Sequence, residues 1–109
     1  MDPRFFRWHE IPTRVPKEGV TMRVVSGDKG MMVFFDIGPH TEIPPHSHPH
    51  EQMGTVLEGE ITLIIGNEER LLNAGDGYVA PSGVAHGART GNQGAKVVDF
   101  FSPPREDYR

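Results

Sequence analysis

Short apolar and β-branched runs, separated by turns rich in glycine and proline, recur along this chain of 109 residues. Residues 31–37 (MMVFFDI) form an apolar run with one aspartate. Because the run is short for a helix and rich in strand formers, it predicts a buried strand. Residues 20–25, 52–57 and 95–102 predict further strands, and no stretch has a helical period. The pattern therefore predicts an all-β protein.

Turn residues indicate how these strands connect. Residues 60–65 and 69–72 lie on either side of a short turn and predict a hairpin. A tight turn is expected at Glu58 and Gly59. The count of eight or more short strands at roughly even spacing is typical of a barrel or a two-sheet jelly roll. The length suits one domain, so we expect residues 1–109 to form a single domain.

Two segments of this pattern are less regular. Residues 4–11 (RFFRWHEI) are aromatic-rich, and they could form an edge strand, cover a dimer surface or pack against the core. Pro44 and Pro45 cannot donate to a β-ladder, so the chain around them is expected to be irregular or to lie at a sheet edge.

Composition and charge exclude several classes of protein. The net charge of −4, with acidic and basic residues interspersed, argues against a nucleic-acid partner. The chain has no cysteine, so any metal must be held by His, Gln, Asp or Glu. No stretch approaches the ~20 apolar residues of a membrane-spanning helix, and the N-terminus does not resemble a signal peptide. We therefore expect a cytoplasmic protein with no membrane partner.

Histidines cluster in residues 46–50, and a further histidine lies in a second stretch about thirty residues later. His46, His48 and Gln52 share one parity, so on an extended strand they would point to the same face. His86 follows a proline and a glycine in the second stretch. Three imidazoles and an amide oxygen form a four-ligand set for a divalent metal, with room for water or substrate. Such a set could hold Zn, Ni, Fe, Co or Mn.

The remaining histidines are expected to lie outside this ligand set. His50 has the same parity but would crowd the ion, so we expect it beside the ligands as a hydrogen-bond donor. His9 and His40 are expected at the surface. The rival explanation of residues 46–50 is an adventitious metal-binding tract, which gives His86 no role.

Candidate catalytic groups lie in the C-terminal stretch. Asp99 and Phe101 share a parity, and a carboxylate beside a bound cation is a candidate general acid or base. Arg105 could grip a substrate carboxylate with two parallel hydrogen bonds. Asp99 could equally face solvent, and Arg105 could belong to a mobile tail or to a surface ion pair.

The two histidine stretches resemble the conserved boxes of the cupin superfamily. The first reads H-x-H-x3-Q-x6-G over residues 46–59, and the second reads G-x5-P-x-G-x2-H over residues 75–86. The resemblance covers roughly residues 30–101. It implies a cupin-type jelly-roll β-barrel that binds one divalent transition metal, and it says little about the substrate.

Three positions depart from the family pattern. Gln52 replaces the usual glutamate, Thr90 stands where an asparagine is common, and His40 replaces an expected glycine. The glutamine has a chemical consequence, because four neutral ligands leave the charge of the ion uncompensated. Such a site should favour an anionic substrate and Lewis-acid chemistry over redox chemistry.

The C-terminal signature D-x-F-S-P-x-R-E-D-aromatic, over residues 99–108, narrows the resemblance. Together with H-x-H-x3-Q it is similar to the small KdgF-type cupins of pectin and alginate breakdown, which convert 4,5-unsaturated monouronates to the linear keto form. Small cupins commonly pair through their sheets, so a homodimer is also implied. By this resemblance the metal ligands would be His46, His48, Gln52 and His86, and the substrate site would be lined by Asp99, Phe101 and Arg105.

Two other classes of function stay open from the sequence. One is a metal-dependent dioxygenase or lyase acting on another small molecule. It predicts oxygen consumption and a pocket richer in apolar residues. The other is a small-molecule-binding cupin without turnover.

Overall fold

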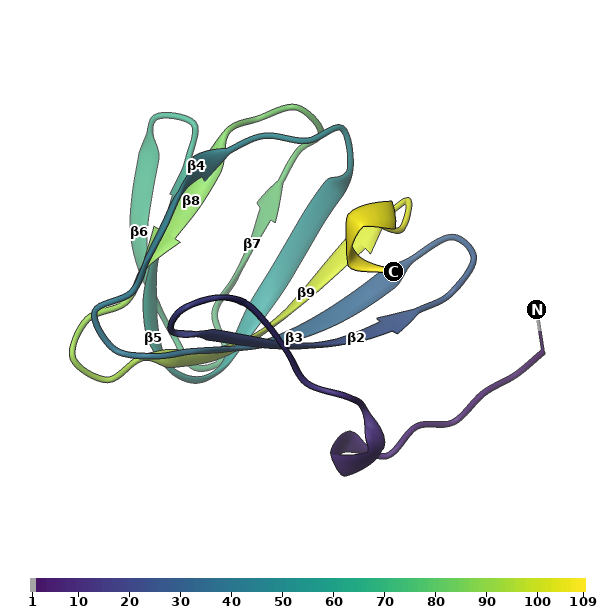
Figure 1. Cartoon of the computed structure of the whole chain (residues 1–109). Helices are drawn as coiled ribbons and strands as arrows, with labels where there is room; N and C mark the ends of the chain where they lie inside the picture. Colours follow the sequence, from purple (N-terminus) through teal and green to yellow (C-terminus); the bar gives the residue numbers. More distant parts are fainter. Residues whose placement is uncertain (1) are drawn as a thin grey trace.

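Strand β5 organises the fold, because it is long enough to belong to two sheets at once. The computed structural model describes residues 2–109, and within them β5 pairs with β7 and β9 along its first half and with β6 and β8 along its second. The path β1-β2-β3-β9-β5-β8-β4 curls into a half-barrel (Figure 1). The strands are β1 (Arg14–Lys17), β2 (Val20–Ser26), β3 (Met31–Ile37), β4 (Glu42–His46), β5 (Glu51–Ile65), β6 (Glu68–Asn73), β7 (Gly77–Ala80), β8 (His86–Arg89) and β9 (Ala95–Ser102).

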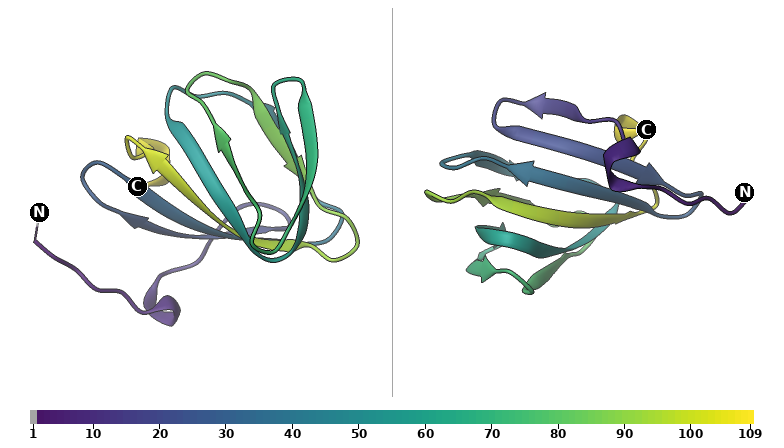
Figure 2. Two further views of the ribbon diagram at one scale, coloured as in Figure 1. Left: turned by 180° about the vertical axis from the view of Figure 1, so that it is seen from behind. Right: turned by 90° about the horizontal axis from the view of Figure 1, so that it is seen from below.

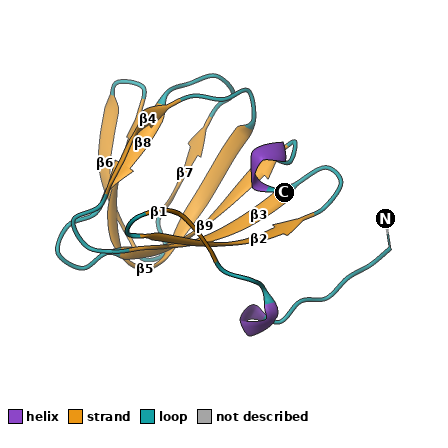
Figure 3. Ribbon diagram, viewed as in Figure 1, coloured by secondary structure: helices purple, strands orange, loops and turns teal. Residues whose placement is uncertain are grey.

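The curled all-β architecture confirms the expected fold class. Within residues 2–109 the helical elements are two single turns of 3-10 helix, η1 (Trp8–Glu10) and η2 (Glu106–Tyr108) (Figure 3). None of the helices in this part of the chain is long and apolar enough to cross a membrane.

The tight turn expected at Glu58 and Gly59 is wrong. The strand runs on through both residues, and the pairing with β9 shifts register between Val56 and Glu58. Gly59 has φ 77°, and a Cβ there would overlap the carbonyl oxygen of Gly94. The extra residue of this bulge is Leu57, and Gly59 follows it just before β5 begins to pair with β6 at Glu60. The bulge and the glycine therefore bend a continuous strand from one sheet into the other, and there is no hairpin here.

The core fills the inside of the curl. Alternation along β9 sends Ala95, Val97, Asp99 and Phe101 inward, and all four are buried. The largest buried cluster brings together side chains from both sheets, namely Val20, Ile37, Val56, Ile61, Leu63, Ala88, Ala95 and Val97. The same inward face carries both the core and the candidate site.

The aromatic N-terminal segment forms no edge strand. Instead it runs along the outside of the sheet (Figure 2), where the rings of Phe6 and Trp8 meet Phe34 edge to face. The edge strand is β1, whose Pro16 suits an edge position. β4 lies at the other end of the sheet path and has an irregular register, as the prolines before His46 predict.

Candidate metal centre and active site

Three histidines meet at one end of the half-barrel. His46 ends β4, His48 lies in the following loop, and His86 begins β8. One ligand atom from each lies within 4.8 Å of the others. The expectation that His46, His48 and Gln52 share the face of one extended strand is wrong, because the loop 47–50 separates β4 from β5. The residues meet because the chain reverses there and because β4 pairs with β8, His46 opposite His86.

Backbone carbonyls hold each of these imidazoles in one orientation. His46 Nδ1 lies 3.1 Å from the Pro44 carbonyl, His48 Nδ1 3.0 Å from that of His50, and His86 Nδ1 3.0 Å from that of Val84. Since a carbonyl only accepts, each Nδ1 must donate, and each Nε2 is left with its lone pair exposed. This is the arrangement by which proteins orient metal-binding histidines.

The amide of Gln52 is likewise held in one orientation. Its Nε2 donates to the Tyr78 hydroxyl at 2.6 Å and to Asp99 Oδ2 at 3.1 Å, which turns Oε1 toward the histidines. Oε1 lies 3.0 Å from His48 Nε2, close to the ~3 Å expected of neighbouring atoms that each lie ~2.1 Å from one ion.

These donor atoms fit a divalent cation. In the neutral tautomer of His48, Nε2 and Gln52 Oε1 are two acceptors that face each other without a proton between them. His86 Nε2 is buried and has no hydrogen-bond partner among the described residues. A cation that accepts lone pairs from all these atoms would satisfy them together.

The protonation of the histidines also suits metal binding. Burial lowers the pKa of His86, and the neighbouring imidazoles and Arg105 lower it further. Burial is likewise the main cause that lowers the pKa of His48. Both imidazoles therefore stay neutral, as metal ligands must be, to lower pH than an exposed histidine would.

His50 takes part through its backbone, not through the ring donor that we expected. Its carbonyl accepts from His48, and its ring packs against that of His48 at 5.3 Å between centroids. His9 and His40 are exposed, as expected.

A carboxylate lies directly behind Gln52. Asp99 is 7% exposed, so it does not face solvent, and its Oδ1 accepts from the Tyr78 hydroxyl at 2.7 Å. Burial raises its pKa to about 7, although the hydrogen bonds from Tyr78 and Gln52 oppose the rise. Burial, followed by the charge of Asp99, holds the pKa of Tyr78 well above its usual range. Asp99 can thus take up or release a proton near neutral pH while Tyr78 stays protonated.

The C-terminal segment is docked over the site. The guanidinium of Arg105 lies 4.1 Å from the ring centroid of Tyr108 and 5.4 Å from that of Phe101. Asp107 accepts from Arg105 Nε at 3.1 Å and from Nη2 at 2.7 Å. Because Asp107 occupies that side of the guanidinium, the Nη1–Nη2 edge is the one left for a ligand.

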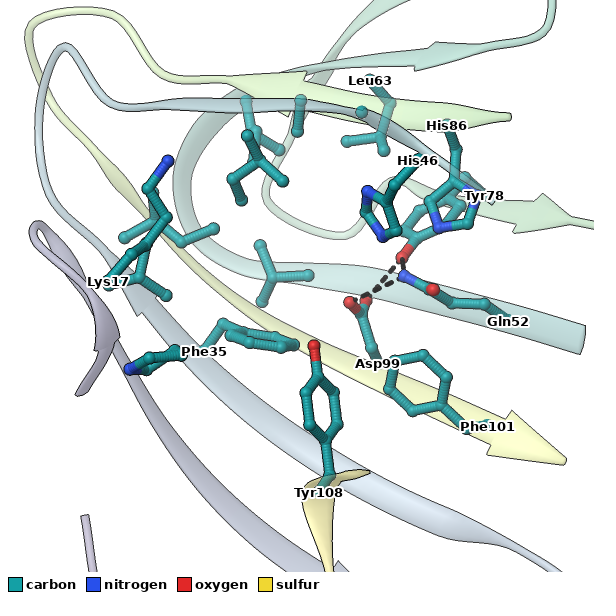
Figure 4. Close-up of a pocket in the computed structure, with 18 of the residues that line it drawn as sticks. Lys17, Phe35, His46, Gln52, Leu63, Tyr78, His86, Asp99, Phe101 and Tyr108 are labelled. Carbon is teal, nitrogen blue, oxygen red and sulfur yellow. Dashed lines mark hydrogen bonds between the residues drawn. The ribbon is translucent and has the colours of Figure 1, made fainter. Parts of the chain in front are cut away.

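These groups share one cavity of about 190 Å³ (Figure 4). Its lining includes His46, Gln52, His86, Asp99, Phe101 and Arg105, together with Tyr78 and Tyr108. His48 completes the histidine cluster beside it. The structure therefore brings together every site residue expected from the sequence.

Two tyrosines of the cavity were not anticipated. Tyr78 begins a short apolar run, YVAP, in which nothing marks its hydroxyl as internal. The pairing of β7 with β5 places it opposite Gly54, and this glycine leaves room for its contact with Asp99. In the sequence Tyr108 is only part of an acidic and aromatic ending, and its place in the cavity depends on the docking of the tail.

The chain is similar to known proteins in both sequence and structure. Residues 33–101 match the family model of the cupin domain. The chain is 31% identical over 107 residues to the pectin degradation protein KdgF of Dickeya dadantii (strain 3937), covering 96% of this chain and 97% of that protein. The structure of KdgF from Halomonas sp. superposes with a TM-score of 0.94 at 30% identity, over 99% of this chain and 100% of that one. A shorter match, 38% identical over 66 residues, covers 60% of this chain and 28% of the H2HPP isomerase of Bacillus subtilis.

Proposed function

This chain belongs to the cupin family, and we propose that it is a metal-dependent enzyme that converts 4,5-unsaturated monouronates to their linear keto form. The observation that supports this proposal is one cavity holding a histidine cluster, a buried carboxylate and an arginine. The similarity to the pectin degradation protein KdgF of Dickeya dadantii and to the structure of KdgF from Halomonas sp. extends over nearly the whole length of each chain.

The metal would be held by His46 Nε2, His48 Nε2, His86 Nε2 and Gln52 Oε1. The donor set suits Zn, Ni, Fe, Co or Mn without choosing among them. When bound, a divalent ion there supplies Lewis-acid polarisation of a substrate oxygen. Because the four ligands are neutral, they would not compensate the charge of the ion, and the site would attract an anionic substrate.

The reaction is an isomerisation that neither adds nor removes atoms. The bond between C1 and the ring oxygen breaks, C1 becomes an aldehyde and C5 becomes a ketone. Overall one proton leaves the hydroxyl on C1 and one is added at C4. Asp99 shuttles the proton, because it is the buried carboxylate that faces the cavity. Tyr78 and Gln52 hold Asp99 in place, and Arg105 binds the substrate carboxylate through its free edge.

Phe101 and Tyr108 support this binding. Their rings flank the guanidinium of Arg105, which restricts its movement and strengthens its field by excluding water. The same two rings pack against each other at 5.7 Å between centroids. The docked tail thus covers the carboxylate-binding side of the cavity.

The Asp99→Asn variant tests the proposal. The wild-type protein should contain about one metal ion per chain and accelerate loss of the ring form of 4,5-unsaturated galacturonate. The variant should keep its metal while kcat falls about 10²- to 10⁴-fold, the usual range for removing a general acid or base. Elemental analysis and the ultraviolet absorbance of the substrate double bond measure the two quantities.

Asp36→Asn is the matched control, because Asp36 is an exposed aspartate on β3 and its loss should leave turnover unchanged. Unchanged turnover in Asp99→Asn would refute the proton-transfer role. Metal-replete protein that leaves the substrate untouched but consumes oxygen with another small molecule would favour the dioxygenase alternative.

We also propose that residues 1–109 form one cupin domain and that the protein is a homodimer. The single domain is supported by the two ends of the chain, because β1 and β2 extend the sheet beyond the family match and the tail lines the cavity.

The homodimer is supported by the outside of the sheet, where the strand register aligns a row of apolar side chains across five strands. Contiguous exposed apolar surface of this kind marks interaction sites. The row consists of Val25, Met32, Phe100, Met53 and Val79.

A further inference from the structure

The lining of the cavity changes from polar to aliphatic within two residues on two strands, one from each sheet. On β9, Asp99 is followed inward by Val97, and on β8, His86 is followed by Ala88. Each step of two residues advances about 7 Å along a strand and returns to the same face. Each sheet therefore turns aliphatic about 7 Å from its polar residue along the strand.

Register shows that this aliphatic end is continuous. Val97 pairs with Val56 of β5 and with Phe35 of β3, and Ala88 pairs with Leu63. Val97, Ala88 and Leu63 all line the cavity, and each is at most 7% exposed. In Figure 4 the labelled Phe35 and Lys17 lie on the opposite side of the view from Gln52 and His86.

Lys17 also lines this end, and its Nζ donates to the Glu42 carbonyl at 2.6 Å, but the wall formed by Val97, Ala88 and Leu63 carries no polar side-chain atom. A ligand hydroxyl packed against that wall would lose its water without gaining a hydrogen-bond partner. The edge of the ligand that packs on this wall should therefore be carbon that bears no oxygen. In a 4,5-unsaturated monouronate C1, C2 and C3 carry hydroxyls, and C5 carries the ring oxygen and the carboxylate. C4 is the one ring carbon without an oxygen substituent.

We infer that the aliphatic end, formed by Val97, Ala88 and Leu63, is a specificity subsite that receives the C4 edge and selects 4-deoxy uronates over uronates with a hydroxyl on C4. The inference rests on the proposed uronate substrate and adds to it a reason for rejecting ordinary saturated sugar acids. It also gives a role to the apolar lining that a dioxygenase pocket would share.

Binding of two stable ligands tests the subsite without requiring turnover. Isothermal titration calorimetry on the purified protein, with its metal content measured, compares galacturonate with its 4-deoxy analogue, which differs by one hydroxyl. The analogue should bind about 10- to 100-fold more tightly, the discrimination that an apolar pocket achieves against an added hydroxyl.

Substitution of Val97 by threonine places a hydroxyl in the wall at nearly constant volume. The ratio of the affinity for the 4-deoxy analogue to that for galacturonate should fall at least threefold in Val97→Thr. Val98→Thr is the matched control, because Val98 is equally buried on the same strand but faces away from the cavity, and its ratio should stay at the wild-type value. Ala88→Ser adds a hydroxyl to the cavity wall from the other sheet and changes the side chain less. It replaces Val97→Thr in this test if that variant does not fold.

A wild-type ratio near one, failure of both sugars to bind, or equal narrowing in Val97→Thr and Val98→Thr would overturn the subsite. Failure of the proposed reaction is a separate outcome. A protein that prefers the 4-deoxy ligand but leaves 4,5-unsaturated galacturonate unchanged keeps the subsite and loses the proposed activity.

Discussion

Gly54 leaves the space that the buried carboxylate of Asp99 occupies. A Cβ at this position would overlap Asp99 Oδ1 and lie 2.8 Å from Tyr78 Cε1. Gly54→Ala should therefore displace the Asp99–Tyr78 pair and lower kcat by about 10²-fold, the effect of misplacing a reacting group by about 1 Å. Steady-state kinetics and metal analysis check this.

Gly91→Ala is the control for that substitution. Among residues 2–109, none other than its two chain neighbours lies within 4 Å of a Cβ placed on Gly91, and its φ is not in the left-handed region. The control should keep full activity. A Gly54→Ala protein with wild-type kcat would show that the placement of Asp99 does not limit the reaction.

Individual residues were predictable from sequence where spacing constrained them. The H-x-H-x3-Q motif and the distant His86 predicted the group of donors that the structure gathers. Gly54 and Tyr78 could not be found in this way, because their roles depend on the register between β5, β7 and β9. Arg105 was ambiguous, since a proline-rich tail does not reveal whether it docks.

At the scale of the element, an ion pair within the tail orients Arg105, because Asp107 lies 2.7 Å from its Nη2. Asp107→Asn should raise KM for the anionic substrate about two- to fivefold, because an exposed ion pair contributes about 0.2–1 kcal/mol, while kcat changes less. Glu106→Gln is the control, since Glu106 pairs with Arg109 at the surface and should leave KM unchanged. Equal KM values in all three proteins would exclude Asp107 from positioning Arg105.

The same pair predicts a pH dependence. Its hydrogen bond from Arg105 lowers the pKa of Asp107, so the carboxylate is ionised and the pair intact above the ordinary aspartate value of about 3.9. The pair is lost only as the pH falls through the lowered value. The NMR signal of the Arg105 Nε–H should stay protected down to that range, and its loss near neutral pH would contradict the assignment.

Strands with a strong apolar pattern could be predicted from the sequence. Strands that form only because they pair with adjacent strands could not. β3 and β9 followed from residue type alone. β8 was missed, because its four residues HGAR have no strand pattern and become a strand by pairing with β4 and β5. The prediction of a turn at Gly59 failed because a glycine with positive φ can also lie within a continuous strand, here two residues after a bulge.

At the scale of the molecule, the apolar row on the outer face predicts a dimer that one charge should disrupt. Phe100 and Met53 lie opposite each other at the centre of the row and are about 40% exposed. Phe100→Asp should weaken self-association at least 30-fold, as loss of a central aromatic contact does. Sedimentation velocity at several concentrations measures this.

Leu71→Asp provides the comparison, because Leu71 is 57% exposed on β6 and lies outside the row. It should leave association unchanged. A wild-type chain that stays monomeric at all concentrations would refute the dimer.

The hydrogen bonds from the three imidazoles to backbone carbonyls determine how a metal ion would enter the proposed site. The loops fix the rings before any ion arrives, so loading requires little rearrangement of the chain. We therefore expect one divalent ion to exchange for another without unfolding. Because neutral imidazole and amide donors accept many such ions, the metal found in the isolated protein should follow the supply in the producing cell.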